Sequence, residues 1–309
     1  MKIKNLLAPL TLHMPWKKTK PLTLCIDTTY RCNLKCKHCY FLKKKYKNEL
    51  SNEEWIRKIR KLNRIYNFLL CSWIGGEPLL RRSLVKKGIK YFPFNWVVTN
   101  GMFEIPKWRN TIFFVSVDGT KNYHEWLRGK NTYTIVKNNI LNSKAEIFLA
   151  MTINRRNHSC LEKFVREWST TNVKGIGFSF HSPLKAKDEL FIPPKKRDIV
   201  LERILKLKRE YPDFIILTRR IIELMKSYNY KKVVGRNCII RTISICLNPE
   251  GNVKNPCLFE SIKCEECGCS IPYGVYAFFQ KDLETAKLGL RLIKPKISSL
   301  KKIMKLFLT

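Results

Sequence analysis

The sequence predicts an α/β fold in which a parallel sheet forms a partial (β/α)6 barrel of the TIM type. Apolar runs of strand length recur six times between residues 20 and 210, and helical patterns separate most of them. Most of these runs are continuously apolar, which is typical of parallel strands that are covered on both faces. Alternation of strand and helix gives right-handed crossovers, so the loops that follow the strands should meet at one rim.

The expected elements follow from the apolar patterns. We expect strands at residues 22–27, 68–74, 95–100, 112–118, 146–154 and 175–181. Helical patterns cover residues 51–66, 121–142, 159–169 and 194–210. The first helix opens with "SNEE", in which Ser51 and Glu54 predict a capping box. Six strand-then-helix units therefore account for the predicted barrel.

The composition predicts a large core and a strongly basic surface. The chain has 309 residues, of which 45% are hydrophobic, and its net charge is +36. Such a charge attracts nucleic acid, an anionic membrane surface or an acidic substrate, although a merely solubilising surface would look the same. No apolar run approaches the ~18 residues of a membrane span, and we read no signal peptide. We therefore expect a cytoplasmic location, with peripheral contact at the inner membrane face as an option.

The character of the sequence divides the chain into four parts. Residues 1–19 form an N-terminal extension, 20–232 the core barrel, 233–280 a cysteine-rich region and 281–309 a basic amphipathic tail. In the tail, Leu300, Ile303, Met304 and Phe307 share one helical face, with lysines off that face. Such a helix suits an anionic membrane interface, and it would equally suit packing on the barrel.

Three of the 12 cysteines share a short loop after the first predicted strand. In "YRCNLKCKHCY", Cys32, Cys36 and Cys39 have the spacing C-x3-C-x2-C. In a reducing compartment, clustered cysteines are more often metal ligands than disulfides. Three thiolates can hold three irons of a [4Fe–4S] cluster and leave the fourth iron open. The alternative is a zinc site that His38 or a remote ligand completes.

This loop, placed after a barrel strand, resembles the radical S-adenosylmethionine (SAM) superfamily. That family has an aromatic residue before the last cysteine, and here the position holds His38, followed by Tyr40. The resemblance covers about residues 20–180. It implies a [4Fe–4S] cluster that reductively cleaves SAM to a 5′-deoxyadenosyl radical, which abstracts hydrogen from an unactivated carbon. It also implies an electron donor such as flavodoxin or ferredoxin.

Further motifs extend the resemblance to the residues that bind SAM. "GGEP", with Gly75, Gly76 and Glu77, looks like the glycine motif that binds the SAM amino group. Glycines let a backbone approach a ligand closely, and a carboxylate can accept hydrogen bonds from an ammonium.

Residues after the later strands complete the implied SAM site. "SVDG" and "HEWLRGK" are similar to a segment of SPASM-type members, which implies that Ser116 and Arg128 hold the SAM carboxylate. By the same resemblance, Asn100 in "TNG" and Asn154 line the ribose and adenine side. "DG" and "NG" are also ordinary turns, and Arg128 could be a solvated helix residue.

A second cysteine group lies near the C-terminus. "CLNPEGNVKNPC" and "CEECGC" resemble the auxiliary-cluster region of SPASM-like and hopanoid-type radical SAM enzymes. Six cysteines are fewer than two clusters need, so we expect one auxiliary [4Fe–4S] cluster. The expected ligands are Cys246, Cys257, Cys264 and Cys267, with Cys238 and Cys269 as competing candidates. A structural zinc is the alternative.

Four other residues are less specific. Cys25, Cys71 and Cys160 are most simply buried thiols within strand or helix patterns. His181 ends the sixth predicted strand, where it could be an acid or base, touch substrate or have a structural role.

The substrate is the weakest part of the prediction. The basic amphipathic ends, the charge and the hopanoid-type resemblance favour a lipid or isoprenoid chain. A peptide is the alternative, because SPASM-type enzymes commonly mature peptides. RNA modification is a further alternative, as is a metal-binding nucleic-acid scaffold without turnover.

Overall fold

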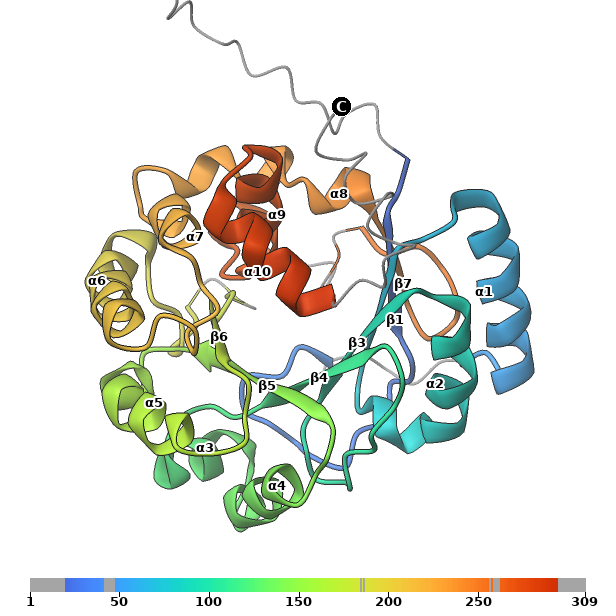
Figure 1. The fold of residues 1–309 in the computed structure, drawn as a ribbon, viewed down its shortest axis with the longest axis horizontal. Helices are drawn as coiled ribbons and strands as arrows, with labels where there is room; N and C mark the ends of the chain where they lie inside the picture. Colours follow the sequence, from blue (N-terminus) through green and yellow to red (C-terminus); the bar gives the residue numbers. More distant parts are fainter. Residues whose placement is uncertain are drawn as a thin grey trace, which may run out of the picture.

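A seven-stranded parallel sheet, surrounded by helices, forms the body of the molecule (Figure 1). This computed structural model describes residues 20–41, 48–183, 185, 187–255, 257 and 262–293. The strand order is β6-β5-β4-β3-β2-β1-β7, so β6 and β7 are the two edges of an open barrel. The N-terminal extension 1–19, and the apolar face expected at Leu300 to Phe307, lie outside the described residues.

The first six strands confirm the predicted parallel strands, although no helix separates β3 from β4 in the described residues 100–110. They are β1 (Thr23–Asp27), β2 (Leu70–Ile74), β3 (Phe94–Thr99), β4 (Thr111–Ser116), β5 (Glu146–Ile153) and β6 (Ile176–Phe180). Each pairs in parallel with its neighbour, as in the register of Cys25 with Ser72 and of Ser72 with Trp96. The loops after these strands consequently share one rim, as expected.

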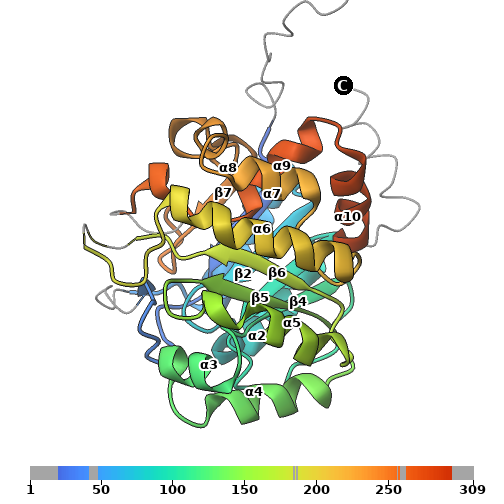
Figure 2. The ribbon, with the colours of Figure 1, turned by 90° about the vertical axis from the view of Figure 1, so that its left-hand side faces the viewer.

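The helices cover the outside of the sheet (Figure 2). They are α1 (Asn52–Tyr66), α2 (Arg82–Gly88), α3 (Lys121–Arg128), α4 (Thr132–Leu141), α5 (Leu161–Ser169), α6 (Pro194–Glu210), α7 (Arg219–Met225), α8 (Ile240–Ile243), α9 (Ile271–Phe279) and α10 (Leu283–Ile293). Ser51 and Glu54 form the predicted capping box. The helix expected at 121–142 is two helices, because Gly129 adopts a φ of 117° and ends α3.

A seventh strand was not predicted. Residues Ser244–Leu247 form β7, which pairs in parallel with the free edge of β1. The chain then turns back at Gly251, and Leu247 bridges Val253. The cysteine-rich region therefore begins as part of the barrel sheet.

The two faces of the sheet differ in burial. Trp73 faces the helices, because its ring lies where a side chain on Gly88 of α2 would have to go. Ser72, the next residue along the strand, therefore faces the barrel interior. Cys25, Ala150, Gly177 and Ser179 also face the barrel interior, and these residues are half-buried. The residues before and after each of them in the strand face the helices and are buried. Small, partly accessible residues thus line the concave face at these positions, whereas Trp96, Phe114 and Phe148 fill it on the side toward α10.

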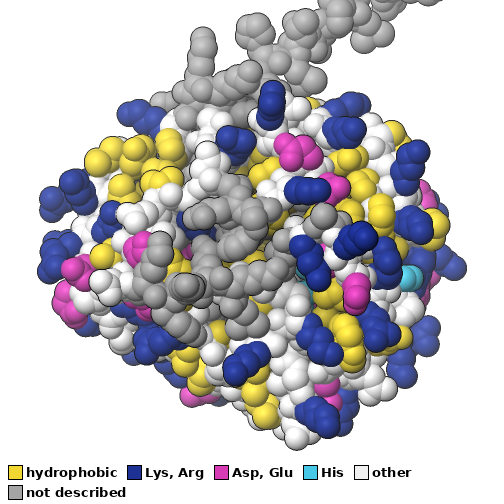
Figure 3. All heavy atoms as spheres, turned by 180° about the vertical axis from the view of Figure 1, so that it is seen from behind, with side chains coloured by type: hydrophobic (Ala, Val, Ile, Leu, Met, Phe, Trp, Pro, Cys, Tyr) yellow, Lys and Arg dark blue, Asp and Glu magenta, His cyan; other side chains and the backbone are white. Residues whose placement is uncertain are grey.

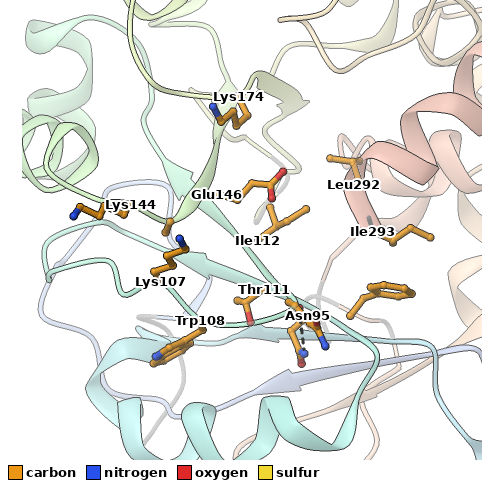
Figure 4. Close-up of a pocket in the computed structure, with 13 residues that line it drawn as sticks. Asn95, Lys107, Trp108, Thr111, Ile112, Lys144, Glu146, Lys174, Leu292 and Ile293 are labelled. Atoms are coloured by element: carbon orange, nitrogen blue, oxygen red, sulfur yellow. Dashed lines mark hydrogen bonds between the residues drawn. The ribbon is translucent and has the colours of Figure 1, made fainter. Parts of the chain in front are cut away.

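Helix α10 covers the end of the barrel opposite the cysteine loop (Figure 1). The Trp96 indole donates to the Leu292 carbonyl over 3.2 Å, and Arg291 donates to the carbonyls of Asp213 and Lys174. A pocket of about 380 Å³ lies there, between the amino-terminal ends of β3 to β5 and α10 (Figure 4). The first part of the expected tail region is consequently a docked helix.

The surface is basic over wide areas. Figure 3 shows Lys and Arg side chains spread around one face and interleaved with apolar side chains, not gathered in one patch. Among the residues with described structure, none of the helices is long and apolar enough to cross a membrane.

The close contact between Gly88 and Trp73 generates a stability prediction. A Cβ added at Gly88 would lie 2.1 Å from the Trp73 ring, so Gly88→Ala should lower the unfolding free energy by about 1–3 kcal/mol. Gly274→Ala in α9 is the control, because the nearest atom to its Cβ would be 3.5 Å away. Urea unfolding measures both, and equal stability of the two variants would contradict the packing described.

Candidate active site

The cysteine loop follows β1 and is partly enclosed. Cys36 is buried, whereas Cys32 and Cys39 are half-buried, and the amide of Cys39 donates to the carbonyl of Cys36 over 3.1 Å. Burial raises the pKa of Cys36 to about 11, although the charge of Arg128 opposes this. Burial also raises the pKa of Cys32. Without a metal the thiols of Cys32 and Cys36 stay protonated at neutral pH, so binding a metal would release their protons.

The donor set fits an iron–sulfur cluster. Three thiols on one short loop are the soft ligands that such clusters use. The fourth candidate, His38, has Nε2 3.5 Å from Asp118 Oδ2, whereas its buried Nδ1 has no hydrogen-bond partner among the described residues, so a zinc site that includes His38 stays an alternative. Burial lowers the pKa of His38 to about 4, so the imidazole is neutral at pH 7.

The "GGEP" loop runs directly beside the cysteine loop. The Gly76 amide donates to the Thr29 carbonyl over 2.8 Å, and the Glu77 amide donates to the Arg31 carbonyl over 3.0 Å. A Cβ on Gly76 would lie 2.1 Å from the Arg31 carbonyl oxygen, and Gly75 has a φ of 122°. The two glycines are therefore required by this contact between loops, a reason that the sequence alone did not reveal.

Glu77 links the loops that follow β2 and β3. Its buried carboxylate accepts from the Thr99 hydroxyl at 2.8 Å, the Leu79 amide at 2.9 Å and the Asn100 amide at 2.8 Å. Burial raises the pKa of Glu77, while these hydrogen bonds favour the ionised form. Asn100 in turn donates to Asn33 over 2.8 Å and lies 3.7 Å from Cys32 Sγ.

A buried ion pair fixes the fourth loop. Arg128 Nε donates to Asp118 Oδ2 over 2.7 Å, and the Thr152 amide donates to Asp118 Oδ1 over 2.9 Å. Burial of Asp118 opposes its ionisation, but Arg128, His38 and the Thr152 amide together hold its pKa below the usual range. The amide of Lys37 donates to the Leu127 carbonyl over 2.9 Å, which ties the cysteine loop to the end of α3.

The other expected SAM contacts lie on the same rim. Ser116 is half-buried at the end of β4 and shares the inward-facing row with Ala150. Asn154 is fully buried, and its side-chain oxygen accepts from the amides of Arg156 and Asn157. The Asn154 side-chain oxygen therefore stabilises the loop that follows β5.

No role is predicted from the sequence for two acidic residues of this site, Asp118 and Asp188. Asp118 was quoted within "SVDG" without a role, and Asp188 was not singled out. His181 Nε2 lies 3.0 Å from Asp188 Oδ2, and both side chains are buried. The rings of His181 and His38 meet edge to face at 6.4 Å. The ten-residue spacing from Asp118 to Arg128 on one loop and helix was the available signal for the ion pair.

The cysteine-rich region bridges the two edges of the barrel. At one edge, Cys246 lies in β7 beside β1. At the other, the Phe180 amide of β6 donates to the Gly268 carbonyl over 2.8 Å, and Gly268 packs directly on the Phe180 backbone. From α6, Arg197 donates to the carbonyls of Glu266 and Cys267.

The thiols of this region are electrostatic neighbours. A thiolate at one of these cysteines would raise the pKa of one or more of the others, and the group comprises Cys238, Cys257, Cys264, Cys267 and Cys269. A thiolate at Cys246 would likewise raise the pKa of Cys257. Within the described ranges, no three chelating side chains converge as they would around a single metal ion. Cys25, expected to be an isolated buried thiol, is half-buried and lies beside Cys246 across the β1–β7 pair.

The Asp118–Arg128 pair generates a prediction for the stability of this rim. Asp118→Asn leaves a buried guanidinium without its counter-charge, so the unfolding free energy should fall by about 3–5 kcal/mol. Because the pKa of Asp118 is lowered in the folded state, this loss should be full above pH ~4 and shrink as the pH falls further.

A matched control uses an exposed ion pair. Arg82 and Glu104 lie 3.6 Å apart at the surface, so Glu104→Gln should cost about 0–1 kcal/mol. Denaturant unfolding at pH 7 compares the two variants. Equal losses would show that the buried pair does not secure the rim.

Comparisons with known proteins agree with this geometry. Residues 26–231 match the sequence profile of the radical SAM superfamily. The sporulation killing factor maturation protein SkfB of Bacillus subtilis is 30% identical over 156 residues, which are 44% of this chain and 37% of SkfB. A probable GTP 3′,8-cyclase of Saccharolobus solfataricus is 24% identical over 262 residues, 74% of this chain and 83% of that protein.

Solved structures share the fold. Streptococcus suis SuiB bound to S-adenosylmethionine superposes with a TM-score of 0.62 at 12% identity, over 88% of this chain and 66% of SuiB. The anSMEcpe structure with bound AdoMet and a Cp18Cys peptide gives 0.61 at 17% identity, over 78% of this chain and 75% of that chain. The chain thus spans well under half of SkfB and about two thirds of SuiB. Because the profile match covers more than half of its length, the chain belongs to the radical SAM superfamily, whose enzymes use a [4Fe–4S] cluster and SAM.

Proposed function

We propose that the rim cleaves SAM reductively, with the cluster held by Cys32, Cys36 and Cys39. The hydrogen bonds among the loops support this proposal. They join the cysteine loop to "GGEP", to Asn100 and to the end of α3, so the residues expected to hold the cluster and SAM lie together. When bound, the cluster supplies the electron that splits SAM into methionine and a 5′-deoxyadenosyl radical. Flavodoxin or ferredoxin would serve as the external electron donor.

The residues of the rim would orient SAM. Glu77 would accept from the SAM amino group, and three hydrogen bonds from Leu79, Thr99 and Asn100 orient its carboxylate. Arg128, together with Ser116, would bind the SAM carboxylate. The hydrogen bond from Arg128 Nε to Asp118 orients the guanidinium before SAM binds. Asn100 and Asn154 would line the ribose and adenine side. Burial of Glu77 and Asn154 keeps this part of the rim dry, which strengthens the polar contacts.

We also propose an auxiliary [4Fe–4S] cluster in the cysteine-rich region. The proposed ligands are Cys246, Cys257, Cys264 and Cys267, with Cys238 and Cys269 as alternatives and a structural zinc as the competing occupant. Zinc–sulfur bonds of about 2.3 Å would draw four thiolates close around one ion, a spacing that is not seen among the described thiols. A cluster spreads its thiolates over several metal atoms, so neighbouring but separated thiols suit it better.

The loss of one loop cysteine tests SAM cleavage. After anaerobic reconstitution with iron and sulfide, the wild-type chain should form 5′-deoxyadenosine with dithionite and SAM, and Cys36→Ala should reduce this to background. Cys71→Ala is the matched control, because that thiol is fully buried under the helices, away from the rim. Chromatography with mass detection measures the product.

The opposite results would be equally clear. Product formation by Cys36→Ala at the wild-type rate would remove the cysteine loop from the reaction. A wild-type chain that takes up stoichiometric zinc and no iron would replace the cluster by a zinc site.

We infer that the substrate is a peptide. The relatives support this, since SkfB is named as a maturation protein and a SuiB structure contains a precursor peptide. The residues of the concave face nearest the rim, such as Ala150, Gly177 and Ser179, are small and partly accessible, and the net charge of +36 favours an acidic peptide. The lipid substrate favoured by the sequence rested on the two basic ends of the chain, the net charge and the hopanoid-type resemblance, and both ends lie outside the described residues.

Deuterium transfer identifies the substrate class directly. Host cells are grown in heavy water, and their peptide, lipid and RNA fractions are each offered to the reconstituted enzyme with unlabelled SAM. Because the radical takes hydrogen from substrate carbon, the peptide fraction should yield 5′-deoxyadenosine that is one mass unit heavier. The Cys36→Ala chain controls for exchange. Label from the lipid or RNA fraction alone would assign the substrate to that class instead.

A further inference from the structure

Cys25 and Cys246 face each other across two neighbouring strands. They are register partners in the parallel pair β1–β7, where adjacent strands run about 4.8 Å apart. In such a pair, side chains in register point to the same face of the sheet. Cys25 is also in register with Ser72, so both thiols face the barrel interior.

The surroundings of this thiol pair are polar. The Ser244 hydroxyl lies 3.7 Å from Cys246 Sγ, and Cys257 lies near enough for a thiolate at Cys246 to raise its pKa. Lys254 lies on the same side, where its Nζ contacts Asp27 Oδ2 at 2.6 Å and its amide donates to the Cys246 carbonyl.

Cys71 shows what a merely structural thiol looks like in this fold. It is fully buried on the helix-facing side of β2, and burial alone accounts for its raised pKa. Cys25, in the neighbouring strand, is half-buried and sits among another thiol, a carboxylate and an ammonium. These two strand cysteines therefore have different environments, although the sequence presents them alike.

We propose that Cys25 is a thiolate ligand of the auxiliary metal site, together with Cys246 and Cys257. This proposal rests on the proposed auxiliary cluster. It raises the number of thiols available there from six to seven, since Cys238, Cys264, Cys267 and Cys269 remain on the side toward β6. Binding needs no redox change in the protein: the thiol loses its proton to solvent and the sulfur bonds to the metal.

The test removes the loop cluster first. In a Cys32→Ala, Cys36→Ala, Cys39→Ala background, metal that remains after anaerobic reconstitution belongs to the auxiliary site. Cys25→Ala is then added to this background, with Cys246→Ala as the positive comparison and Cys71→Ala as the matched control. Iron, zinc and sulfide per chain, and the low-temperature EPR spectrum after reduction, are measured.

Cys25→Ala should lose metal or change the EPR spectrum as Cys246→Ala does, whereas Cys71→Ala should match the background. If Cys25→Ala matches the background while Cys246→Ala loses metal, Cys25 is a neighbour and not a ligand. Circular dichroism checks folding, and Cys25→Ser offers a second variant that keeps a small polar side chain at this position without the sulfur.

A background chain without metal would overturn both the auxiliary site and the role of Cys25. The loop cluster would still stand in that case, provided that the wild-type chain binds iron that the triple variant loses. The two proposals therefore fail by different results.

Discussion

The close backbone contact between "GGEP" and the cysteine loop is the constraint on which the rest of the rim depends. Gly76 packs on the Arg31 carbonyl so closely that no side chain fits between them. The contact continues the pairing of β1 and β2 past the strand ends, so a loop that would otherwise be free is held as an extension of the sheet. Glu77 then carries the connection to the third loop, and the Asp118–Arg128 pair secures the fourth.

The C-terminal third of the chain completes the barrel in two places. The cysteine-rich region joins β7 to β1 and also binds the end of β6, so it spans the gap between the two edge strands. Helix α10 lies over the amino-terminal strand ends, where Trp96 holds it. The barrel and the cysteine-rich region thus depend on each other, although their compositions differ sharply.

Local patterns in the sequence predicted the first six strands, because each strand is an apolar run long enough to be recognised alone. The spacing of Cys32, Cys36 and Cys39 likewise predicted a metal site from one loop. The features that could not be predicted from the sequence depend on which distant strands pair and in which register. β7 has four residues and no pattern of its own, and it exists because the edge of β1 accepts it. The partnership of Cys25 with Cys246 could not be read without that register.

Strand β1 carries Cys25 and leads into the loop that carries Cys32 seven residues later. An extended chain of that length spans at most about 25 Å, so a metal at either end would restrain the same short segment. That segment is already ordered, because β1 pairs with β2 on one side and with β7 on the other. A backbone shift on metal binding at one end would therefore change the affinity at the other end, and thermodynamic linkage makes this effect reciprocal.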